Sequence, residues 1–424
     1  MSQPTGVTLA NSPRLRLFVL CALYLAQGVP WGFCAITLVA WLAERGHSTN
    51  EIGSLMALST LPWTFKWAWG PVLDAVRLPG GRRRPWIVIA ESAMAVTVLG
   101  MALLPDPNRE LELLGWLIFL HNCFNAMQDV AVDALAVDLL DEQERGRANG
   151  LMYGSKYLGG AIGGAGMATV VASLGMRTAM VGQAVLLFAI LLLPLLLREG
   201  RREVAAVGAD VEAGMARALA LLANLRRAFS LRTPLLGALL AVCIQLGVGT
   251  LSTVAPVLFT KTLGWSMERY AHVTGFWGVL VGLTGAVGGG LVADRLGHRR
   301  LIAIASVTLG ATWLAFAALQ PLWTSDAFVI AVLMLETLCG ALVSVGLFAL
   351  CMDISWPRVA ATQFTAYMAL LNLSTTLGHK LAGLLDGVLA IAPTYAAAGA
   401  VQIVVVALLL QMDVGQTRRE LGAV

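Results

Sequence analysis

Apolar segments of about twenty residues follow one another along almost the whole chain, separated by short polar loops. Hydrophobic residues make up 58% of the chain and charged residues 13%, whereas a soluble domain carries about 25% charged residues. About 20 apolar residues in a helix cross the hydrocarbon core of a bilayer, so the pattern predicts an all-α polytopic membrane protein. The twelve expected spans are residues 15–42, 52–73, 86–104, 113–137, 148–173, 178–197, 234–260, 271–293, 301–320, 327–351, 360–384 and 394–412.

A loop motif occurs twice. The first copy reads G-P-V-L-D from Gly70 and is followed by an arginine run, and the second reads G-L-V-A-D-R-L-G-H-R-R from Gly290. Asp74 and Asp294 are 220 residues apart, as are the two glycines. Arginine-rich inner loops are common in any polytopic protein, but they do not explain the matched glycine and aspartate. The repeat therefore predicts two similar halves of six spans each.

This motif resembles the signature loop of the major facilitator superfamily, and the second copy is the closer match. The resemblance implies the superfamily's fold, two pseudo-symmetric six-helix halves with a substrate site near the membrane midplane. An aspartate is favoured near a helix N-terminus, and an arginine can pair with it through its forked guanidinium. In the superfamily such groups latch helix ends, which implies a gating role for Asp74, Arg83, Arg84, Asp294, Arg299 and Arg300.

The predicted domains follow from the repeat. A six-helix half at residues 1–197 and another at residues 234–412 are joined by a linker at residues 198–233, and residues 413–424 form a tail. Part of the linker, Val211–Leu225, is rich in Ala and Leu and is expected to form an interfacial helix.

The distribution of basic residues predicts the orientation. Lysine and arginine concentrate in cytoplasmic loops. The first apolar run is too long for a cleaved signal peptide and is expected to be the first span. With the N-terminus inside, both termini, the linker and both copies of the motif are cytoplasmic. The outer loops then hold only Arg45, Arg109, Arg177, Lys261 and Arg269.

The fourth expected span is the most polar. A centred Asp or Lys costs about 2.5–3.5 kcal/mol to insert, so each one needs a reason. Asp129 and Asp133 lie one turn apart and repel, so one of them is expected to hold a proton; with Glu336, the main acid of the second half, they are the predicted proton-coupling residues. The polar face indicates either the wall of a water-filled cavity or a buried structural network. It is formed by His121, Asn122, Asn125, Gln128, Asp129 and Asp133.

Three of the four lysines fall inside expected spans. Lys66 is expected to pair with Asp129 or Asp133, to bind an anionic cargo group, or to snorkel to the inner surface. Lys156 and Lys380 lie too deep to snorkel easily. They are expected either to face a cavity or to form structural ion pairs, with the acid of the tenth span as a candidate partner of Lys380.

The first expected span carries an aromatic and amide face that suits a sugar or amide ligand, and equally suits helix packing. Tyr24, Gln27 and Trp31 share this face at positions i, i+3 and i+7. Gln245 occupies the equivalent span of the second half. The predicted substrate-binding residues are therefore Tyr24, Gln27, Trp31, Lys66, Asn125, Lys156, Gln245 and Lys380.

Two stretches of the first half carry a closer resemblance. Leu61–Asp74 reads L-P-W-T-F-K-W-A-W-G-P-V-L-D, and Ala126–Leu135 reads A-M-Q-D-V-A-V-D-A-L. Both are similar to the AmpG-type branch of the superfamily, which includes muropeptide permeases, siderophore permeases and acetyl-CoA transporters. The resemblance implies proton-driven import across the bacterial inner membrane, with a muropeptide as the best-known cargo. The chain is shorter than the muropeptide permeases of this branch.

Several classes of protein are not indicated. The sequence has no Walker A motif, no HExxH motif and no CxxC pair, so neither an enzyme nor a bound cofactor or metal is expected. Basic runs interleaved with aromatics are missing, so no nucleic-acid partner is expected. The sequence predicts a secondary transporter that works as a monomer in the lipid bilayer. It would import an anionic, amphipathic small molecule such as a muropeptide, together with protons. The alternatives are a siderophore permease and a non-transporting membrane receptor.

Overall fold

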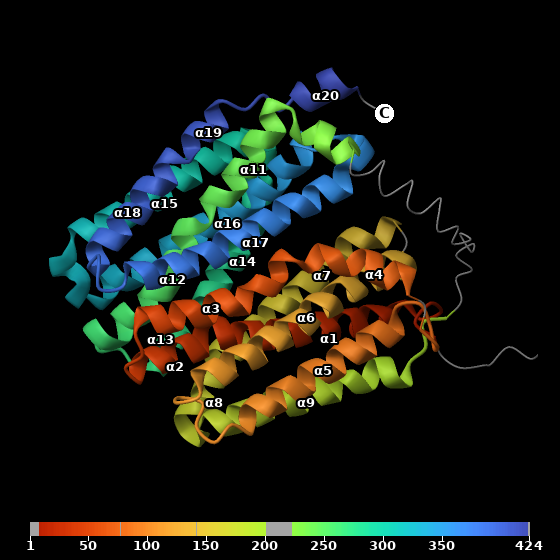
Figure 1. Ribbon diagram of the computed structural model, residues 1–424, viewed down its shortest axis with the longest axis horizontal. Helices are drawn as coiled ribbons and strands as arrows, with labels where there is room; N and C mark the ends of the chain where they lie inside the picture. The colour runs from red at the N-terminus through yellow and green to blue at the C-terminus, as the bar shows by residue number, and fades with distance from the viewer. Residues whose placement is uncertain (1–7, 77, 141, 201–222, 423–424) are drawn as a thin grey trace, which may run out of the picture. The chain divides into compact units, whose positions relative to one another are not determined.

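The computed structural model describes residues 8–76, 78–140, 142–200 and 223–422, and these are almost wholly helical (Figure 1). In this part of the chain, nine helices are long and apolar enough to cross a membrane. The three remaining expected spans also coincide with helices, which are either more polar or broken. The expected all-helical membrane architecture is therefore confirmed.

The chain forms two compact units, each of which contains one short segment from the opposite half of the sequence. Unit 1 comprises Met1–His47, Leu58–Val204 and Gly264–Val279, and unit 2 comprises Ser48–Ala57, Ala205–Leu263 and Leu280–Val424.

Nine helices form the first six spans. They are α1 (Pro13–Gly32), α2 (Val39–Glu44), α3 (Thr49–Thr64), α4 (Trp69–Ala75), α5 (Arg84–Ala102), α6 (Leu111–Leu139), α7 (Glu142–Ala161), α8 (Met167–Leu174) and α9 (Met176–Leu196). Within unit 1, α1 packs along α7, and α5 packs against both α6 and α9 (Figure 1). Leu158, Val185 and Leu192 are more than half exposed on these helices, as a lipid-facing surface requires.

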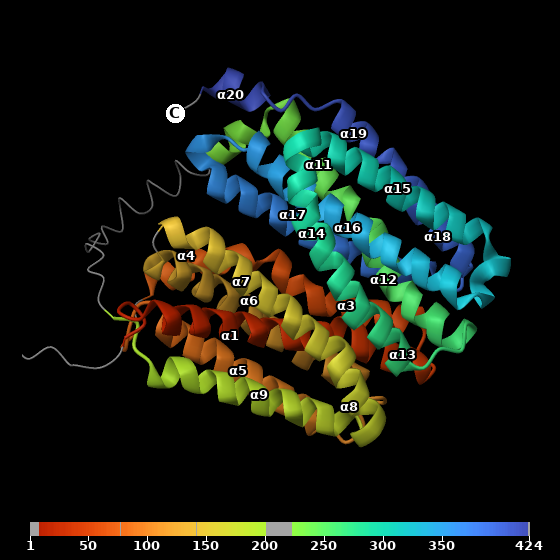
Figure 2. The same cartoon turned by 180° about the vertical axis from the view of Figure 1, so that it is seen from behind.

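The last six spans are built in the same way. Their helices are α11 (Arg232–Ile244), α12 (Leu246–Val257), α13 (Met267–His272), α14 (Gly278–Leu296), α15 (His298–Ala318), α16 (Asp326–Ile354), α17 (Ala360–Leu385), α18 (Ile391–Val404) and α19 (Val406–Leu410), and α20 (Gln416–Leu421) follows them. Within unit 2, α15 packs against α16 and α18 (Figure 2), and α17 packs against α11 and α12. Tyr367 and Ile302 belong to its buried apolar core.

Helix breaks occur at equivalent points of the two halves. Pro30 lies in α1 just before a π-helical turn at Phe33–Leu38, and Pro256 lies in α12 just before a π-helical turn at Leu258–Thr262. Because proline has no N–H to donate, it frees a carbonyl of the preceding turn and favours an irregular turn. Proline and π-helical turn thus occupy the same position in both halves. This agrees with the internal repeat that the loop motif indicates.

Glycines bring the backbone of α1 into direct contact with α7 and with the π-helical turn Ile162–Gly166 that follows it. A Cβ atom added at Gly28 would overlap the carbonyl oxygen of Lys156, and one added at Gly163 would overlap that of Val29. Such close approach is available only to residues without a side chain. The main chain of α7 is thereby fixed against α1.

The linker between the halves is described only at its two ends. The backbone N–H of Leu9 donates to the carbonyl of Arg198 at 2.9 Å, so the start of the chain pairs with the start of the linker. Residues 223–229 are helical, while the remainder of the predicted interfacial helix, Val211–Leu225, lies outside the described residues.

Candidate functional site

Two lysines converge on one buried aspartate within unit 1. Lys66 Nζ lies 2.6 Å from Asp129 Oδ2, and Lys156 Nζ lies 3.4 Å from Asp129 Oδ1. The carboxylate is almost inaccessible at 5% exposed, whereas the lysine side chains are 31% and 27% exposed. The predicted ion pair of Lys66 is confirmed for Asp129, and its ammonium therefore does not snorkel away. Lys66, Asp129 and Lys156 are named the lysine–aspartate cluster.

A break in the second span places Lys66. α3 contains Pro62 and ends at Thr64, and Phe65 leaves the α-helical region with φ −102° and ψ 7°. A single 3₁₀ turn at Lys66–Ala68 follows before α4 begins. Proline inside a helix removes a hydrogen bond and clashes with the preceding turn, which accounts for the break so close to it. Lys66 therefore stands at an irregular turn instead of inside a continuous helix.

Aromatic rings flank both ammonium groups. The Nζ atoms of Lys66 and Lys156 lie 5.9 Å and 5.3 Å from the centroid of the Trp63 ring, and Lys156 Nζ lies 5.8 Å from that of Tyr24. The negative face of an aromatic ring attracts a cation within about 6 Å. The cluster therefore combines cationic groups with flat apolar surfaces.

The second aspartate of α6 has a different environment. The Tyr24 hydroxyl donates a hydrogen bond to Asp133 Oδ1, and Tyr24 packs edge-on against Tyr153 at 5.6 Å between ring centroids. Among the described residues Asp133 forms no ion pair. It borders a hollow of about 280 Å³, large enough for several waters at about 30 Å³ each. The hollow is lined by Tyr24, Asp133, Ala136, Val137, Leu140, Asn149 and Tyr153.

A buried layer of amides lies beside the cluster. Gln27 Nε2 donates to Gln128 Oε1 at 2.6 Å, and Gln128 Nε2 donates to Glu91 Oε2 at 3.0 Å. Asn125 is also fully buried, and its amide has no partner in the described part of the chain. The structure thus places Gln27 and Asn125 in the packed interior. Their contact with cargo remains a proposal that requires α1 or α6 to move.

Trp31, Gln245, Lys380 and Glu336, four further predicted residues, have other surroundings. Trp31 is 47% exposed on α1, and Gln245 occupies the break between α11 and α12. Lys380 Nζ donates to Ser54 Oγ at 3.2 Å. No ion pair joins Lys380 to Glu336 among the residues described, so that expected pairing is not formed.

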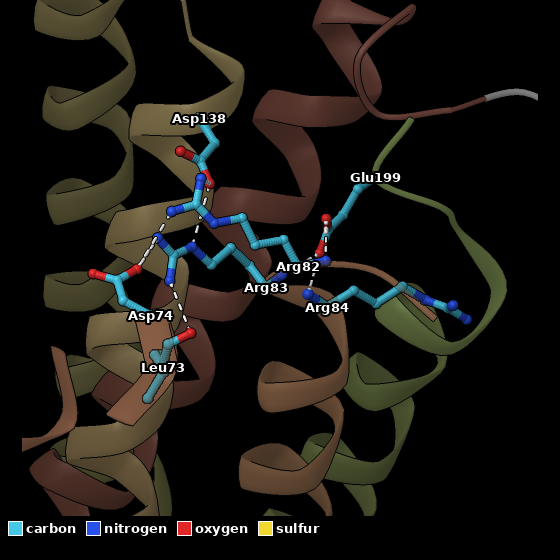
Figure 3. Close-up of polar contacts among 7 residues, drawn as sticks. All are labelled: Leu73, Asp74, Arg82, Arg83, Arg84, Asp138 and Glu199. Carbon is cyan, nitrogen blue, oxygen red and sulfur yellow. Dashed lines mark hydrogen bonds and ion pairs between the residues drawn. The ribbon is translucent and has the colours of Figure 1, made fainter. Parts of the chain in front are cut away.

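The first copy of the loop motif forms an ion-pair network, which Figure 3 shows. Arg83 is buried; its Nη2 lies 2.7 Å from Asp74 Oδ1, and its Nε lies 3.2 Å from Asp138 Oδ2. The predicted pairing of aspartate with arginine is thus confirmed here, and Asp138 is an additional partner. Asp74 lies in the last turn of α4, so the expectation that it stands near a helix N-terminus is wrong.

Arg84 contacts the end of a helix instead of an aspartate. Its Nε donates to the carbonyl of Pro194 at 2.5 Å, at the end of α9. The Glu199 carboxylate accepts hydrogen bonds from the backbone N–H groups of Arg82 at 3.0 Å, Arg83 at 2.7 Å and Arg84, at the start of α5 (Figure 3). A cation at a helix C-terminus and an anion at a helix N-terminus are both stabilised by the helix dipole. Arg84 and Glu199 therefore fasten α5 to α9.

Corresponding contacts occur within unit 2. Arg299 Nη2 donates to the carbonyl of Leu409 at 2.7 Å, at the end of α19, and His298 Nδ1 lies 2.6 Å from Asp353 Oδ2. Asp294 belongs to α14, and its side chain lies outside the described part of the structure.

These contacts define how the two copies of the motif correspond. Arg83 and Arg84 match His298 and Arg299, each 215 residues later, so the offset of 220 residues does not hold at the arginines. The first copy has additional residues between its aspartate and its arginines, which accounts for the change. Arg300, a predicted gating residue, therefore falls one position beyond the matched pair.

Two similar halves of membrane-spanning helices, with charged residues paired inside one of them, define a secondary transporter. The family profile described as Major Facilitator Superfamily matches residues 18–379, and the chain belongs to this superfamily. It is therefore a multi-pass membrane transporter of a small molecule and not an enzyme.

Individual relatives agree with this assignment. The chain is 27% identical over 390 residues to the anhydromuropeptide permease of Escherichia coli (strain K12), covering 89% of this chain and 76% of the permease. It is 23% identical over 367 residues to the putative transporter AmpG 4 of Rickettsia conorii, covering 85% and 87%.

Solved structures confirm the fold. A crystal structure of the D-xylose–proton symporter matches with a TM-score of 0.75 at 15% identity, covering 94% of this chain and 98% of that one. The inward-open xylose transporter XylE of E. coli matches with a TM-score of 0.72 at 11% identity, covering 93% and 96%. At these identities the likeness concerns the fold alone.

Proposed function

We propose that this protein is a proton-coupled importer of an anionic, amphipathic small molecule, with a muropeptide as the favoured cargo. The observation that supports the proposal is the convergence of Lys66 and Lys156 on Asp129 inside an apolar helix bundle. Buried ionisable groups in a membrane protein are costly and usually mark a substrate or ion pathway. The similarity to a permease for anhydromuropeptides favours this cargo.

The charges of the site suggest how proton and cargo bind together. With Asp133 ionised, the charges of Lys66, Lys156, Asp129 and Asp133 sum to zero. With a proton on Asp133, the same group carries one surplus positive charge. A cargo carboxylate neutralises that charge, so binding of the proton favours binding of the anion. Such linkage is reciprocal, which is what symport requires.

The aromatic rings suit the remainder of a muropeptide. Trp63 and Tyr24 present flat apolar faces within 6 Å of the ammonium groups. A sugar ring can stack on such a face while a peptide carboxylate reaches a lysine. Gln245, Glu336 and Lys380 of the second half remain proposed contributors to the same pathway.

The proposed setting is the bacterial inner membrane, with both termini and the linker cytoplasmic and a single chain as the working form. The basic residues of the inner loops support this orientation. The halves at residues 1–197 and 234–412 would rock about the site as in other carriers of this fold. The Asp74–Arg83 and Arg84–Pro194 contacts would hold the cytoplasmic helix ends of the first half during that motion.

Uptake into proteoliposomes tests the proposal. Labelled anhydro-muropeptide is supplied outside, with and without an inward proton gradient. We expect the wild-type protein to accumulate cargo only when the gradient is present. The Lys66→Gln/Lys156→Gln double variant should not accumulate it. The absence of uptake by well-folded protein would exclude this cargo, and ferric siderophores would be assayed next. Cargo binding without flux would favour a receptor.

A further inference from the structure

A third carboxyl group lies deeper in unit 1 than the two aspartates of α6. Glu91, on α5, has 0% of its surface exposed. Its Oε2 accepts a hydrogen bond from Gln128 Nε2 at 3.0 Å, while Oε1 is buried and has no partner among the described residues. Glu91 also lacks an ion pair in this part of the chain. Nothing in the proposed function uses this group.

The helices packed against α5 supply no cation to Glu91. On α6, His121 Nδ1 lies 3.1 Å from Thr97 Oγ1, one to two turns further along α5, and Asp129 is held by its two lysines. The charged residue of α9 is Arg177, at its far end, where it donates to a loop carbonyl. The other near neighbour is the neutral amide of Gln128.

An ionised carboxylate in this position would be buried without a counter-charge. The free-energy cost of such a charge far exceeds that of a neutral acid, and groups of this kind take up a proton instead. By contrast, Asp129 keeps its charge because each of its oxygens has an ammonium partner. The two carboxyl groups, on neighbouring helices, therefore differ in their charge state.

We propose that Glu91 is a proton-binding site of this transporter, protonated in the present conformation and deprotonated during the transport cycle. The inference rests on the proposed proton coupling and adds a specific carrier to it. The proton resides on the carboxyl oxygen that lacks a partner and is released to water. Glu91 then returns to its neutral form before the site closes again.

Two amides separate Glu91 from the hollow beside Asp133. Gln27 lies one turn beyond Tyr24 on α1, and Gln128 directly precedes Asp129 on α6. Their hydrogen bond, 2.6 Å long, joins α1 to α6 across this layer. A movement of α1 against α6 that breaks the bond opens the layer to water. Because an anionic cargo would compete with Asp129 for its two lysines, binding at the cluster is transmitted to Glu91 through the adjacent residue Gln128.

The direct test is the Glu91→Gln variant, which mimics the neutral acid and cannot ionise. Glu112→Gln, at an exposed carboxylate on α6, is the matched control. Infrared spectra of purified protein at neutral pH report protonated carboxylic acids without any cargo. We expect Glu91→Gln to lose one carboxylic-acid band that the control retains. An unchanged band would overturn the proposal.

Transport by the same variants tests coupling. Gradient-driven accumulation should fall at least tenfold in Glu91→Gln, while exchange of cargo across the membrane and the thermal midpoint are retained. Accumulation at the wild-type level would overturn the proposal. If wild-type protein itself fails to accumulate cargo, the proposed function fails, and the infrared result still decides whether Glu91 carries a proton.

If the Glu91→Gln variant does not fold, the Glu91→Asp variant replaces it in the infrared experiment. A shifted carboxylic-acid band would support the proposal, and an ionised carboxylate would contradict it.

Discussion

Asp129 is held by two ammonium groups, and this surplus of positive charge decides how the site responds to substitution. In the Asp129→Asn variant, Lys66 and Lys156 lose the carboxylate that both of them contact. We expect gradient-driven uptake to be abolished and the free energy of unfolding to fall by about 1.5–3 kcal/mol, the usual range for a hydrogen bond to a charged group. Transport assays and thermal unfolding in detergent measure the two effects.

The control for this prediction is a double variant that removes one positive and one negative charge together. Asp129→Asn combined with Lys156→Gln eliminates one charge of each sign, so its unfolding midpoint should lie above that of Asp129→Asn alone. A double variant that is as unstable as the sum of the two single variants would show that the charges do not interact.

Lys156 tests whether the cluster recognises an anion. The Lys156→Gln variant should raise the KM for an anionic cargo about tenfold, which corresponds to roughly 1.4 kcal/mol of lost binding. An analogue whose carboxylates are amidated should be transported equally by the variant and the wild-type protein. Lys261→Gln, at an exposed lysine in a predicted outer loop, is the control and should leave both values unchanged.

Sequence reasoning located the residues of the cluster but only part of their geometry. An ion pair of Lys66 with Asp129 or Asp133 was one of three predictions, because such groups are costly to leave alone in a membrane, and the structure selects Asp129. The second bond, from Lys156, was not predictable, since nothing in the local pattern of α7 shows which helix it faces. The contact of Glu91 with Gln128 was missed for the same reason.

Among the helices, the fastening of α5 to α9 makes a separate prediction. Glu199→Ala removes the carboxylate that accepts from the N–H groups at the start of α5. A lost N-terminal cap costs about 0.5–2 kcal/mol, so we expect a decrease of about 1 kcal/mol in the free energy of unfolding. Chemical denaturation measures it, with Glu112→Ala as the control at an exposed carboxylate. Equal stability of the two variants would mean that the cap does not stabilise the structure.

The contact of α1 with the π-helical turn Ile162–Gly166, which follows α7, predicts a strict requirement for glycine. A Cβ at Gly163 would overlap the carbonyl oxygen of Val29, whereas one at Gly154, also on the fifth span, would meet nothing within 4 Å. Gly163→Ala should therefore destabilise the protein by about 1–3 kcal/mol, while Gly154→Ala should be neutral or slightly stabilising. Similar unfolding midpoints for the two variants would contradict the close backbone packing.

The spans themselves were largely predictable from hydropathy, because length and apolar character suffice to define a membrane helix. Breaks within them were not. Pro62 accounts for the break in the second span, but a proline alone does not predict the 3₁₀ turn that carries Lys66. The π-helical turns after Pro30 and Pro256 likewise need the packing of neighbouring helices to be recognised.

Across the whole molecule, equivalent residues of the internal repeat form equivalent contacts in the two halves. The end of α9 binds Arg84, and the end of α19 binds the matching Arg299. The repeated glycine and aspartate predicted two halves. Which arginines of the two copies correspond could be determined only from the structure, because residues inserted in the first loop shift the alignment. The match of His298 with Arg83 was hidden by the change of residue type.

The central claim is that proton and anionic cargo move together through the lysine–aspartate cluster. The most direct measurement records the internal pH of proteoliposomes, without an imposed proton gradient, when anhydro-muropeptide is added outside. We predict that the interior acidifies as cargo enters and that a protonophore abolishes the pH change. The Asp129→Asn variant should show neither cargo entry nor acidification. Cargo entry by wild-type protein with no change of internal pH would contradict the account.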